Sequence, residues 1–260
     1  MSLRNNGKQK EGITIETKRL NGNCAEDIVI AAELLKNGGL VAIPTETVYG
    51  LAADATNGAA VERIFKAKGR PQDNPLIVHI SSYEQLERLV SHIPEHAKRL
   101  METFWPGPLT VILPKSNLIP DQVSAGLPTV AVRLPSHPVA RAVIQEAGVP
   151  LAAPSANVSG SPSPTAAAHV LHDLDGKIDA VIDGGPCTIG LESTVITLAE
   201  ETPVLLRPGA VTLEQLQQVL GTVKMADAVL HQLKQGSVAA SPGMKYKHYA
   251  PKAKLILLEG

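Results

Sequence analysis

Short apolar stretches alternate with segments of helical period along most of this 260-residue chain, and this alternation limits the possible folds more than any other feature. Short apolar runs bounded by turn residues are typical of buried strands, whereas apolar residues at every third or fourth position are typical of helices. Strands are predicted at 40–43, 76–80, 109–113, 129–133, 151–153, 180–182, 193–198 and 204–207. Helices are predicted at 24–36, 58–66, 83–90, 94–104, 137–147, 165–173 and 212–220.

This order of elements predicts an α/β protein with an open, twisted sheet and flanking helices. The sheet is expected to be mixed, because the strands at 193–198 and 204–207 follow one another without a helix between them. Open α/β sheets bind their ligands at strand ends. The polar loops that follow the predicted strands are therefore the first place to expect a ligand cavity.

The sequence predicts one main domain with a segment of different character at each end. Residues 1–23 are expected to form an N-terminal tail and lead-in, and residues 24–220 the main domain. Residues 221–251 are predicted to be a linker or lid, since much of this segment carries Gly, Ser and Pro without a clear period. Residues 252–260 are expected to be the start of a further domain.

Composition argues against several classes of protein. The net charge of −1 and an aromatic content of 3% make a large nucleic-acid surface or a base-stacking platform improbable. Two cysteines, Cys24 and Cys187, stand far apart, which argues against a disulfide framework and favours a reducing compartment. Without a secretory signal or a run of about 18 apolar residues, the chain is predicted to be cytoplasmic and not to span a membrane.

No standard nucleotide, metalloprotease or serine-hydrolase signature is present, so the candidate chemistry lies in polar clusters at strand ends. These clusters occupy 44–50, 66–75 and 154–164, and Arg133 and Arg207 each end a predicted strand. Each cluster taken alone also fits ordinary turn formation or a solvated surface. Together they combine several cations with hydroxyl and amide groups, which suits an anionic ligand such as a nucleotide polyphosphate.

At these same positions the sequence resembles the YrdC-like family, the threonylcarbamoyl-AMP synthases. The resemblance covers roughly residues 24–251 and rests on six motifs in order: PTETVYGL (44–51), KAKGRPQDNPLIVHI (66–80), WPGPLT (105–110), VAVRLP (130–135), APSANVSG (153–160) and STVI (193–196). The stretch SPGMKYKHYAP (241–251) resembles the interdomain linker of a longer, two-domain branch. The resemblance therefore implies a smaller C-terminal domain, of which 252–260 would be the start.

The family's activity implies a nucleotidyltransferase that makes threonylcarbamoyl-AMP and pyrophosphate from L-threonine, bicarbonate and ATP. The product would supply the threonylcarbamoyladenosine modification of tRNA. By the same resemblance, a catalytic tetrad is formed by Lys68, Arg70, Ser155 and Asn157. Contacts to ATP are implied for Arg70, Asn74, Thr129, Ser155, Ser163, Arg207 and Ser241. L-Threonine would be held by Thr47, His79 and Arg133, with Arg133 clamping its carboxylate.

The implied reaction needs no protein nucleophile, because the attacking oxygen belongs to the carbamate formed on threonine. Mg²⁺ is expected on the ATP phosphates, and no protein residue is assigned as its ligand. The expected partner is the machinery that transfers the threonylcarbamoyl group to tRNA, while direct contact with tRNA stays open. Two alternatives are an RNA-binding module and a carbamoyl-transfer domain of the same fold. Near-neutral charge weighs against the first, and the lack of zinc-finger cysteines weighs against the second.

Overall fold

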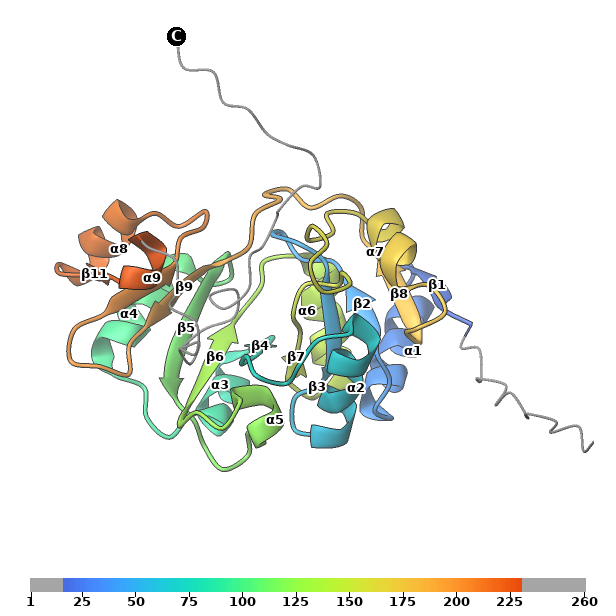
Figure 1. Cartoon of the computed structure of the whole chain (residues 1–260), viewed down its shortest axis with the longest axis horizontal. Coiled ribbons are helices and arrows are strands. Elements are labelled where there is room, and N and C mark those ends of the chain that lie inside the picture. Colours follow the sequence, from blue (N-terminus) through green and yellow to red (C-terminus); the bar gives the residue numbers. More distant parts are fainter. Residues whose placement is uncertain (1–15, 231–260) are drawn as a thin grey trace, which may run out of the picture.

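A computed structural model of the chain describes residues 16–230, and its strands join into one twisted sheet (Figure 1). The order across the sheet is β1-β8-β2-β3-β7-β4-β6-β5-β9-β10-β11. The bounds of the strands are β1 Lys18–Asn21, β2 Val41–Ile43, β3 Gly50–Asp54, β4 Ile77–His79, β5 Leu109–Pro114, β6 Thr129–Arg133, β7 Leu151–Ala152, β8 Ala180–Asp183, β9 Thr194–Thr197, β10 Val204–Arg207 and β11 Lys224–Met225. The sheet contains parallel pairs such as β4–β6 and β5–β9 and antiparallel pairs such as β2–β3 and β5–β6. The predicted open, mixed α/β sheet is confirmed.

Helices flank this sheet (Figure 1). Their bounds are α1 Ala25–Lys36, α2 Gly58–Lys68, α3 Tyr83–Leu89, α4 Glu95–Phe104, α5 Asp121–Ser124, α6 Pro138–Ala147, α7 Ala167–Leu174, α8 Leu213–Leu220 and α9 Asp227–Leu230. The seven predicted helices are all present, with ends displaced by up to two residues. No helix among the described residues is both long enough and apolar enough to cross a membrane.

Several elements were not predicted from the sequence. Strand β3 was not predicted, because its sequence GLAAD is rich in Gly and Ala and follows a polar motif. All five of its residues are buried. Strand β1 lies in the segment predicted to be a tail, and it pairs in parallel with β8. The short elements α5, β11 and α9 were also missed, because two to four residues are too few to show a period.

Helices α1 and α6 pack against each other and cover one face of the half of the sheet that contains β2, β3, β7 and β8. The apolar side chains beneath them include Val41, Ala52, Leu151 and Ile182. The opposite face of the sheet belongs to a larger core, to which α2, α3, α4, α7 and α8 all contribute. Strands buried on both faces explain why the sequence shows continuous apolar runs there and no alternation.

The strand register extends the face covered by α1 and α6 into the other half of the sheet. His79 on β4 stands opposite both Leu151 of β7 and Arg133 of β6, so all three side chains share that face. Beyond them this face carries a small apolar cluster whose buried members all come from strands or their ends: Ile77, Ile112, Ala131, Val195 and Leu206. The polar residues His79 and Arg133 thus lie at the edge of the area of the sheet that α1 and α6 cover.

The pairing of β1 makes a testable difference to stability. Leu20 is the buried residue of this strand and packs in the same cluster as α1 and α6, while its neighbour Arg19 is exposed. Leu20→Ala is expected to lower the free energy of unfolding by about 2 kcal/mol, the lower end for a buried leucine. Arg19→Ala should change it by less than about 0.5 kcal/mol. Urea denaturation measures both, and equal small effects would mean that β1 is not part of the folded core.

Candidate functional site

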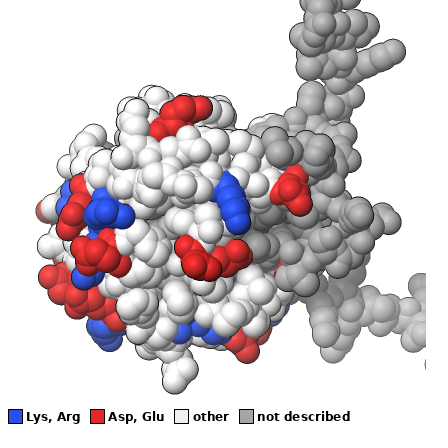
Figure 2. All heavy atoms as spheres, turned by 90° about the vertical axis from the view of Figure 1, so that its left-hand side faces the viewer, with Lys and Arg blue, Asp and Glu red and all other residues white. Residues whose placement is uncertain are grey.

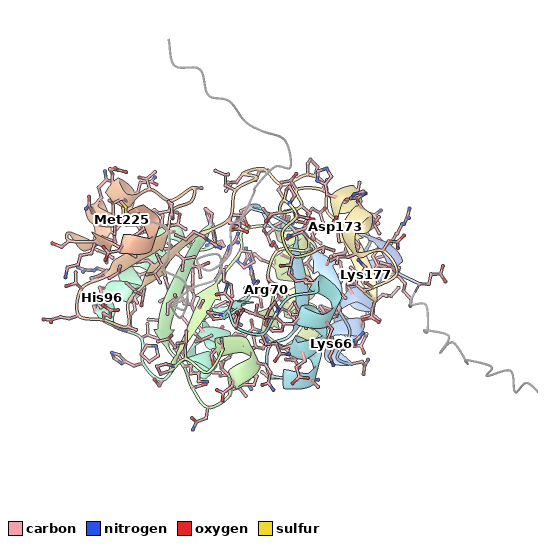
Figure 3. All side chains as sticks on the ribbon, in the orientation of Figure 1. Lys66, Arg70, His96, Asp173, Lys177 and Met225 are labelled. Atoms are coloured by element: carbon pink, nitrogen blue, oxygen red, sulfur yellow. The ribbon has the colours of Figure 1, made fainter. Side chains whose placement is uncertain are left out.

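An open cleft of about 550 Å³, including solvent at its mouth, lies on the sheet face that carries His79 and Arg133. Six of the residues predicted as site residues line it: Thr47, Arg70, His79, Arg133, Ser155 and Arg207. They come from the ends of strands or the loops that follow them, except Arg70, which follows helix α2. Figure 3 shows Arg70 near the middle of the molecule, between α2 and the strands of the other half. Loops at the ends of several strands therefore converge on one cavity, as the sequence predicted.

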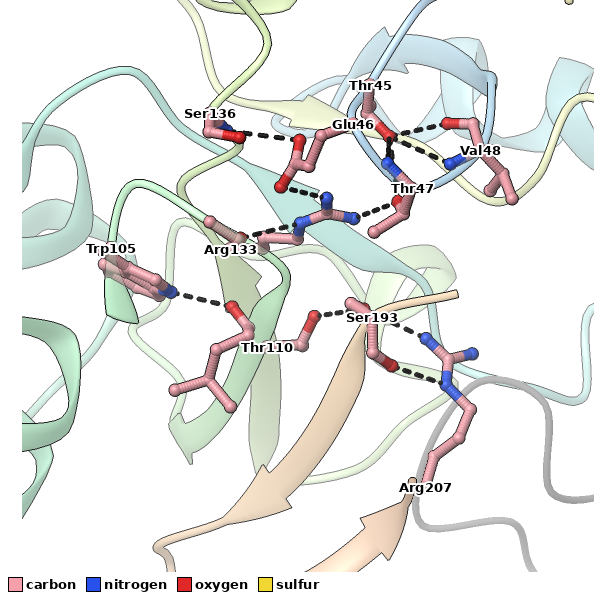
Figure 4. A network of polar contacts seen from close by, with 12 residues as sticks. Thr45, Glu46, Thr47, Val48, Trp105, Thr110, Arg133, Ser136, Ser193 and Arg207 are labelled. Atoms are coloured by element: carbon pink, nitrogen blue, oxygen red, sulfur yellow. Dashed lines mark hydrogen bonds and ion pairs between the residues drawn. The ribbon is translucent and has the colours of Figure 1, made fainter. Parts of the chain in front are cut away.

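Arg133, at the end of β6, is the centre of a buried polar network (Figure 4). Its guanidinium donates from Nη2 to Glu46 Oε1 at 2.6 Å, from Nη1 to Thr47 Oγ1 at 2.8 Å and from Nε to the Gly107 carbonyl at 3.2 Å. The other oxygen of Glu46 accepts the backbone N–H of Ser136 at 3.2 Å. This ion pair joins the loops after β2 and β6 to the WPGPLT motif, which contributes Gly107.

The Thr47 side chain lies in a turn that the hydroxyl group of Thr45 stabilises. Thr45 Oγ1 donates to the Val48 carbonyl at 2.6 Å and accepts the backbone N–H groups of Thr47 and Val48. Its hydroxyl also lies 2.9 Å from that of Thr47. Such side-chain to backbone bonds fix a loop in one conformation. The PTETVYG motif therefore serves to present Thr47 rigidly beside Arg133.

His79 faces Arg133 from β4 and is 4% exposed. Burial, and to a lesser extent the charge of Arg133, lower the pKa of His79 to about 3, so its ring is neutral. A neutral imidazole can donate from one nitrogen and accept at the other. Its Nδ1 atom is buried without a hydrogen-bond partner among the described residues. His79 can therefore offer a polar atom to a ligand in the cleft.

Lys68 does not line the cleft but supports the loop that does. Its ammonium donates to the carbonyls of Ser155 and Asn157 at 2.5 and 2.6 Å, and its own carbonyl accepts the N–H of Ser159. Burial, helped by the Arg70 charge, lowers the pKa of Lys68 to about 7, while the nearby carboxylates of Glu192 and Asp173 oppose the shift. Helix α2 ends just after Lys68, because Gly69 adopts a left-handed φ of 61°. That turn directs Arg70 away from the helix, where it lines the cleft.

The remaining predicted residues lie at differing distances from the cleft. Asn157 is buried behind Ser155, where its amide nitrogen donates to the carbonyls of Val158 and Ser161. Asn74 is fully buried, and Ser163 lines a neighbouring cavity beside α7. Thr129 begins β6, four residues before Arg133, which places it roughly 13 Å along the strand. Ser241 lies outside the described residues.

A second network surrounds Arg207 at the end of β10 (Figure 4). Its Nη1 pairs with Glu192 Oε2 at 3.1 Å, and it also donates to the carbonyl and the hydroxyl of Ser193 at 3.0 and 3.1 Å. The Ser193 hydroxyl continues to Thr110 on β5 at 2.8 Å. The other oxygen of Glu192 accepts the hydroxyl of Ser163 at 3.0 Å.

Sequence reasoning included Glu46 in the polar cluster 44–50 without giving it a role, and it did not assign Glu192 or Ser193 to the site, although both line the cleft. The site was predicted at residues that follow strands, whereas Glu192 and Ser193 precede β9. Glu192 and Ser193 could have been assigned from the antiparallel pairing of β9 with β10. This pairing places the start of β9 beside the end of β10, where Arg207 lies.

The described residues contain no group of three or more His, Cys, Asp and Glu side chains that could hold a metal ion. Glu192 is the one carboxylate among the described residues that line the cleft, and Arg207 and Ser163 already contact it. This donor set does not form a protein-built site for Mg²⁺, which needs several oxygen ligands in octahedral geometry.

A model of the Sua5–YciO–YrdC family, described as telomere recombination, matches residues 33–209. This chain belongs to the Sua5–YciO–YrdC family. A second model, described as the C-terminal domain of threonylcarbamoyl-AMP synthase, matches residues 211–260.

Relatives of this Sua5–YciO–YrdC protein include the threonylcarbamoyl-AMP synthase of Pyrococcus abyssi, which is 56% identical over 233 residues. The enzyme of the same name from Bacillus subtilis is 53% identical over 254 residues. The two alignments cover 90% and 97% of this chain but 68% and 72% of the relatives. A crystal structure of P. abyssi Sua5 complexed with L-threonine superposes with a TM-score of 0.86 at 54% identity, covering 92% of this chain and 70% of that one.

The buried pair of Arg133 and Glu46 should dominate the stability of this site. Glu46→Ala leaves a guanidinium that is 4% exposed without its counter-charge, so the free energy of unfolding is expected to fall by about 3–5 kcal/mol. Glu33→Ala, which removes the partner of Lys36 in an exposed pair, should cost less than about 1 kcal/mol. Chemical denaturation compares the two, and similar losses would argue against the buried pair as a structural centre.

The neutral state of His79 predicts a dependence of stability on pH. Between pH 6.5 and about 3 the unfolded chain binds a proton on His79 that the folded protein does not, so this contribution is present above pH 6.5 and is lost as pH falls. The loss should be about 1.4 kcal/mol per pH unit. Unfolding free energies measured from pH 6.5 to 4.5 should fall less steeply for His79→Gln than for the unaltered protein. Parallel curves would mean that His79 is protonated in the fold.

Proposed function

We propose that this chain forms threonylcarbamoyl-AMP and pyrophosphate from L-threonine, bicarbonate and ATP, for the threonylcarbamoyladenosine modification of tRNA. The observation that carries this proposal is one cleft with two arginine centres, Arg133 and Arg207, each with neighbouring hydroxyl groups. One centre suits the carboxylate of an amino acid, and the other suits phosphate. The names of the relatives and the L-threonine complex of P. abyssi Sua5 support the same activity.

The Arg133 end of the cleft is the proposed site for L-threonine. Three of the five guanidinium N–H groups of Arg133 bond to Glu46, Thr47 and Gly107, so donor capacity remains for the carboxylate of a ligand. Thr47 and His79 supply polar atoms beside it. Because Glu46 holds the guanidinium in place, little side-chain entropy would be lost when the amino acid binds.

The Arg207 end of the cleft is the proposed site for ATP. Arg70, Ser155 and Arg207 line it and offer donors to phosphate oxygens. Lys68 acts by holding the Ser155–Asn157 loop through two carbonyls, and its charge lies close to that of Arg70. Further contacts to the nucleotide are proposed for Asn74, Thr129, Ser163, Asn157 and Ser241 on the resemblance of their motifs. Mg²⁺ would enter on the phosphates and supply positive charge there.

The chemistry proposed for this cleft is positioning and charge stabilisation. The amino group of threonine combines with bicarbonate, with loss of water, to give a carbamate. A carbamate oxygen then attacks the α-phosphorus of ATP, and the bond to pyrophosphate breaks. The nucleophile belongs to the substrate, so the residues of the cleft orient two ligands and offset developing negative charge.

The product would pass to the machinery that transfers the threonylcarbamoyl group to tRNA. On the side of the molecule with α4 and α8, basic and acidic side chains are interspersed, and the coloured residues form no continuous basic area (Figure 2). That face therefore lacks the charge pattern of a nucleic-acid surface.

Pyrophosphate release tests the proposal. Release should require L-threonine, bicarbonate and ATP together, and omission of any one should abolish it. Lys68→Ala should lower the turnover by about 10²–10³-fold, since it removes the amino group that holds two carbonyls of the loop that carries Ser155.

Lys66→Ala is the matched control, because Lys66 is an exposed lysine on the same helix, two residues from Lys68. It should leave the turnover unchanged. Equal rates for both variants would remove Lys68 from the mechanism, and pyrophosphate release that does not depend on threonine would contradict the proposed function.

A further inference from the structure

Glu192 occupies the place of an anionic ligand in the nucleotide end of the cleft. Its carboxylate pairs with Arg207 Nη1 at 3.1 Å and accepts the hydroxyl of Ser163 at 3.0 Å. Both partners are groups proposed to contact ATP. The same carboxylate favours the charged state of Lys68, so its field reaches the cation that supports the loop of Ser155. These contacts are of the kind that a phosphate group makes with such a site.

Glu46, the other carboxylate of the site, is held differently. It accepts a backbone N–H as well as Arg133, its side chain is 7% exposed, and it is not among the residues that line the cleft in the described part of the chain. The side chain of Glu192 is 15% exposed and lines the cleft directly, and it contacts the side chains of Arg207 and Ser163, which could turn to a new acceptor. Glu46 therefore resembles a fixed part of the framework, whereas Glu192 resembles a partner that can be replaced.

We infer, on the basis of the proposed function, that Glu192 is an internal competitor of the ATP phosphates. Without ligand it neutralises Arg207 and keeps that side chain and Ser163 in place. When the triphosphate binds, its oxygens accept the same donors, and the carboxylate must move away because two anions cannot share them. Its return to Arg207 after the reaction favours the departure of pyrophosphate.

A different role for Glu192 would give the opposite result. If the carboxylate only braces Arg207 in the geometry that ATP needs, its neutralisation should weaken the binding of phosphate ligands. If it competes, its neutralisation should strengthen that binding. Glu192→Gln separates the two roles, because glutamine keeps the shape and an acceptor oxygen but loses the charge.

The experiment is calorimetric titration of the whole chain with ATP, pyrophosphate and adenosine, in EDTA so that a divalent ion does not contribute. Glu192→Gln is expected to lower the Kd of ATP and of pyrophosphate by about tenfold and to leave that of adenosine unchanged. Glu200→Gln, which removes an exposed carboxylate on the loop after β9, should change none of the three. Glu192→Asp keeps the charge on a shorter side chain and should give a smaller gain, and it serves as the second variant if Glu192→Gln does not fold.

Unchanged or weaker binding of ATP and pyrophosphate by the Glu192 variants would overturn the inference, as would a gain that extends to adenosine. If the unaltered protein binds ATP and releases pyrophosphate but the variants show no gain, the inference alone fails. If the unaltered protein binds neither phosphate ligand, the proposed function fails with it.

Discussion

The ion pair of Arg133 and Glu46 holds the two halves of the site together. Glu46 follows β2, and Arg133 ends β6, which is separated from β2 in the sheet by β3, β7 and β4. Burial of two charged groups away from water costs free energy unless their remaining hydrogen-bonding groups also find partners. Here the backbone of Ser136, the Thr47 hydroxyl and the Gly107 carbonyl supply those bonds. The loops must therefore adopt one arrangement, and that arrangement is the threonine end of the proposed site.

Among residues 16–230, one face of the sheet is covered unevenly, and the cleft lies where few residues cover it. Helices α1 and α6 bury the face over β2, β3 and β8, while the same face over β4, β6, β5 and β9 carries a few apolar residues and the polar networks of Arg133 and Arg207. The opposite face, by contrast, is covered along its length by one large core. The strands and the short loops next to their ends therefore carry most of the side chains that line the cleft.

Much of this could be predicted from the sequence, for physical reasons that differ between residues. Strands buried on both faces, such as β5 and β6, appear in the sequence as continuous apolar runs. Helices appear as apolar residues at every third or fourth position. The strand-end positions of Thr47, Arg133 and Arg207 were enough to predict that they meet, whereas His79 was assigned to the site through the family resemblance. The role of Lys68 as a support behind the loop was not predictable, because the burial of its ammonium depends on how α2 packs beside residues 155–159.

Acidic partners were missed for a related reason. A carboxylate such as Glu192 becomes a counter-ion only through strand pairing, which brings the start of β9 to the end of β10. The two strands were predicted as neighbours along the chain, but their pairing was not used to assign Glu192.

The outermost strands of the described sheet bear on how this molecule behaves at high concentration. Within the part of the chain that the structure describes, the sheet ends at β11 on one side and at β1 on the other, and unpaired backbone groups at such an edge invite pairing with another chain. Strand β11 offers only two residues, and β1 carries the exposed charges of Lys18 and Arg19. Short length at one described edge and repulsive charge at the other both discourage the addition of a strand from another chain, without closure of the sheet into a barrel.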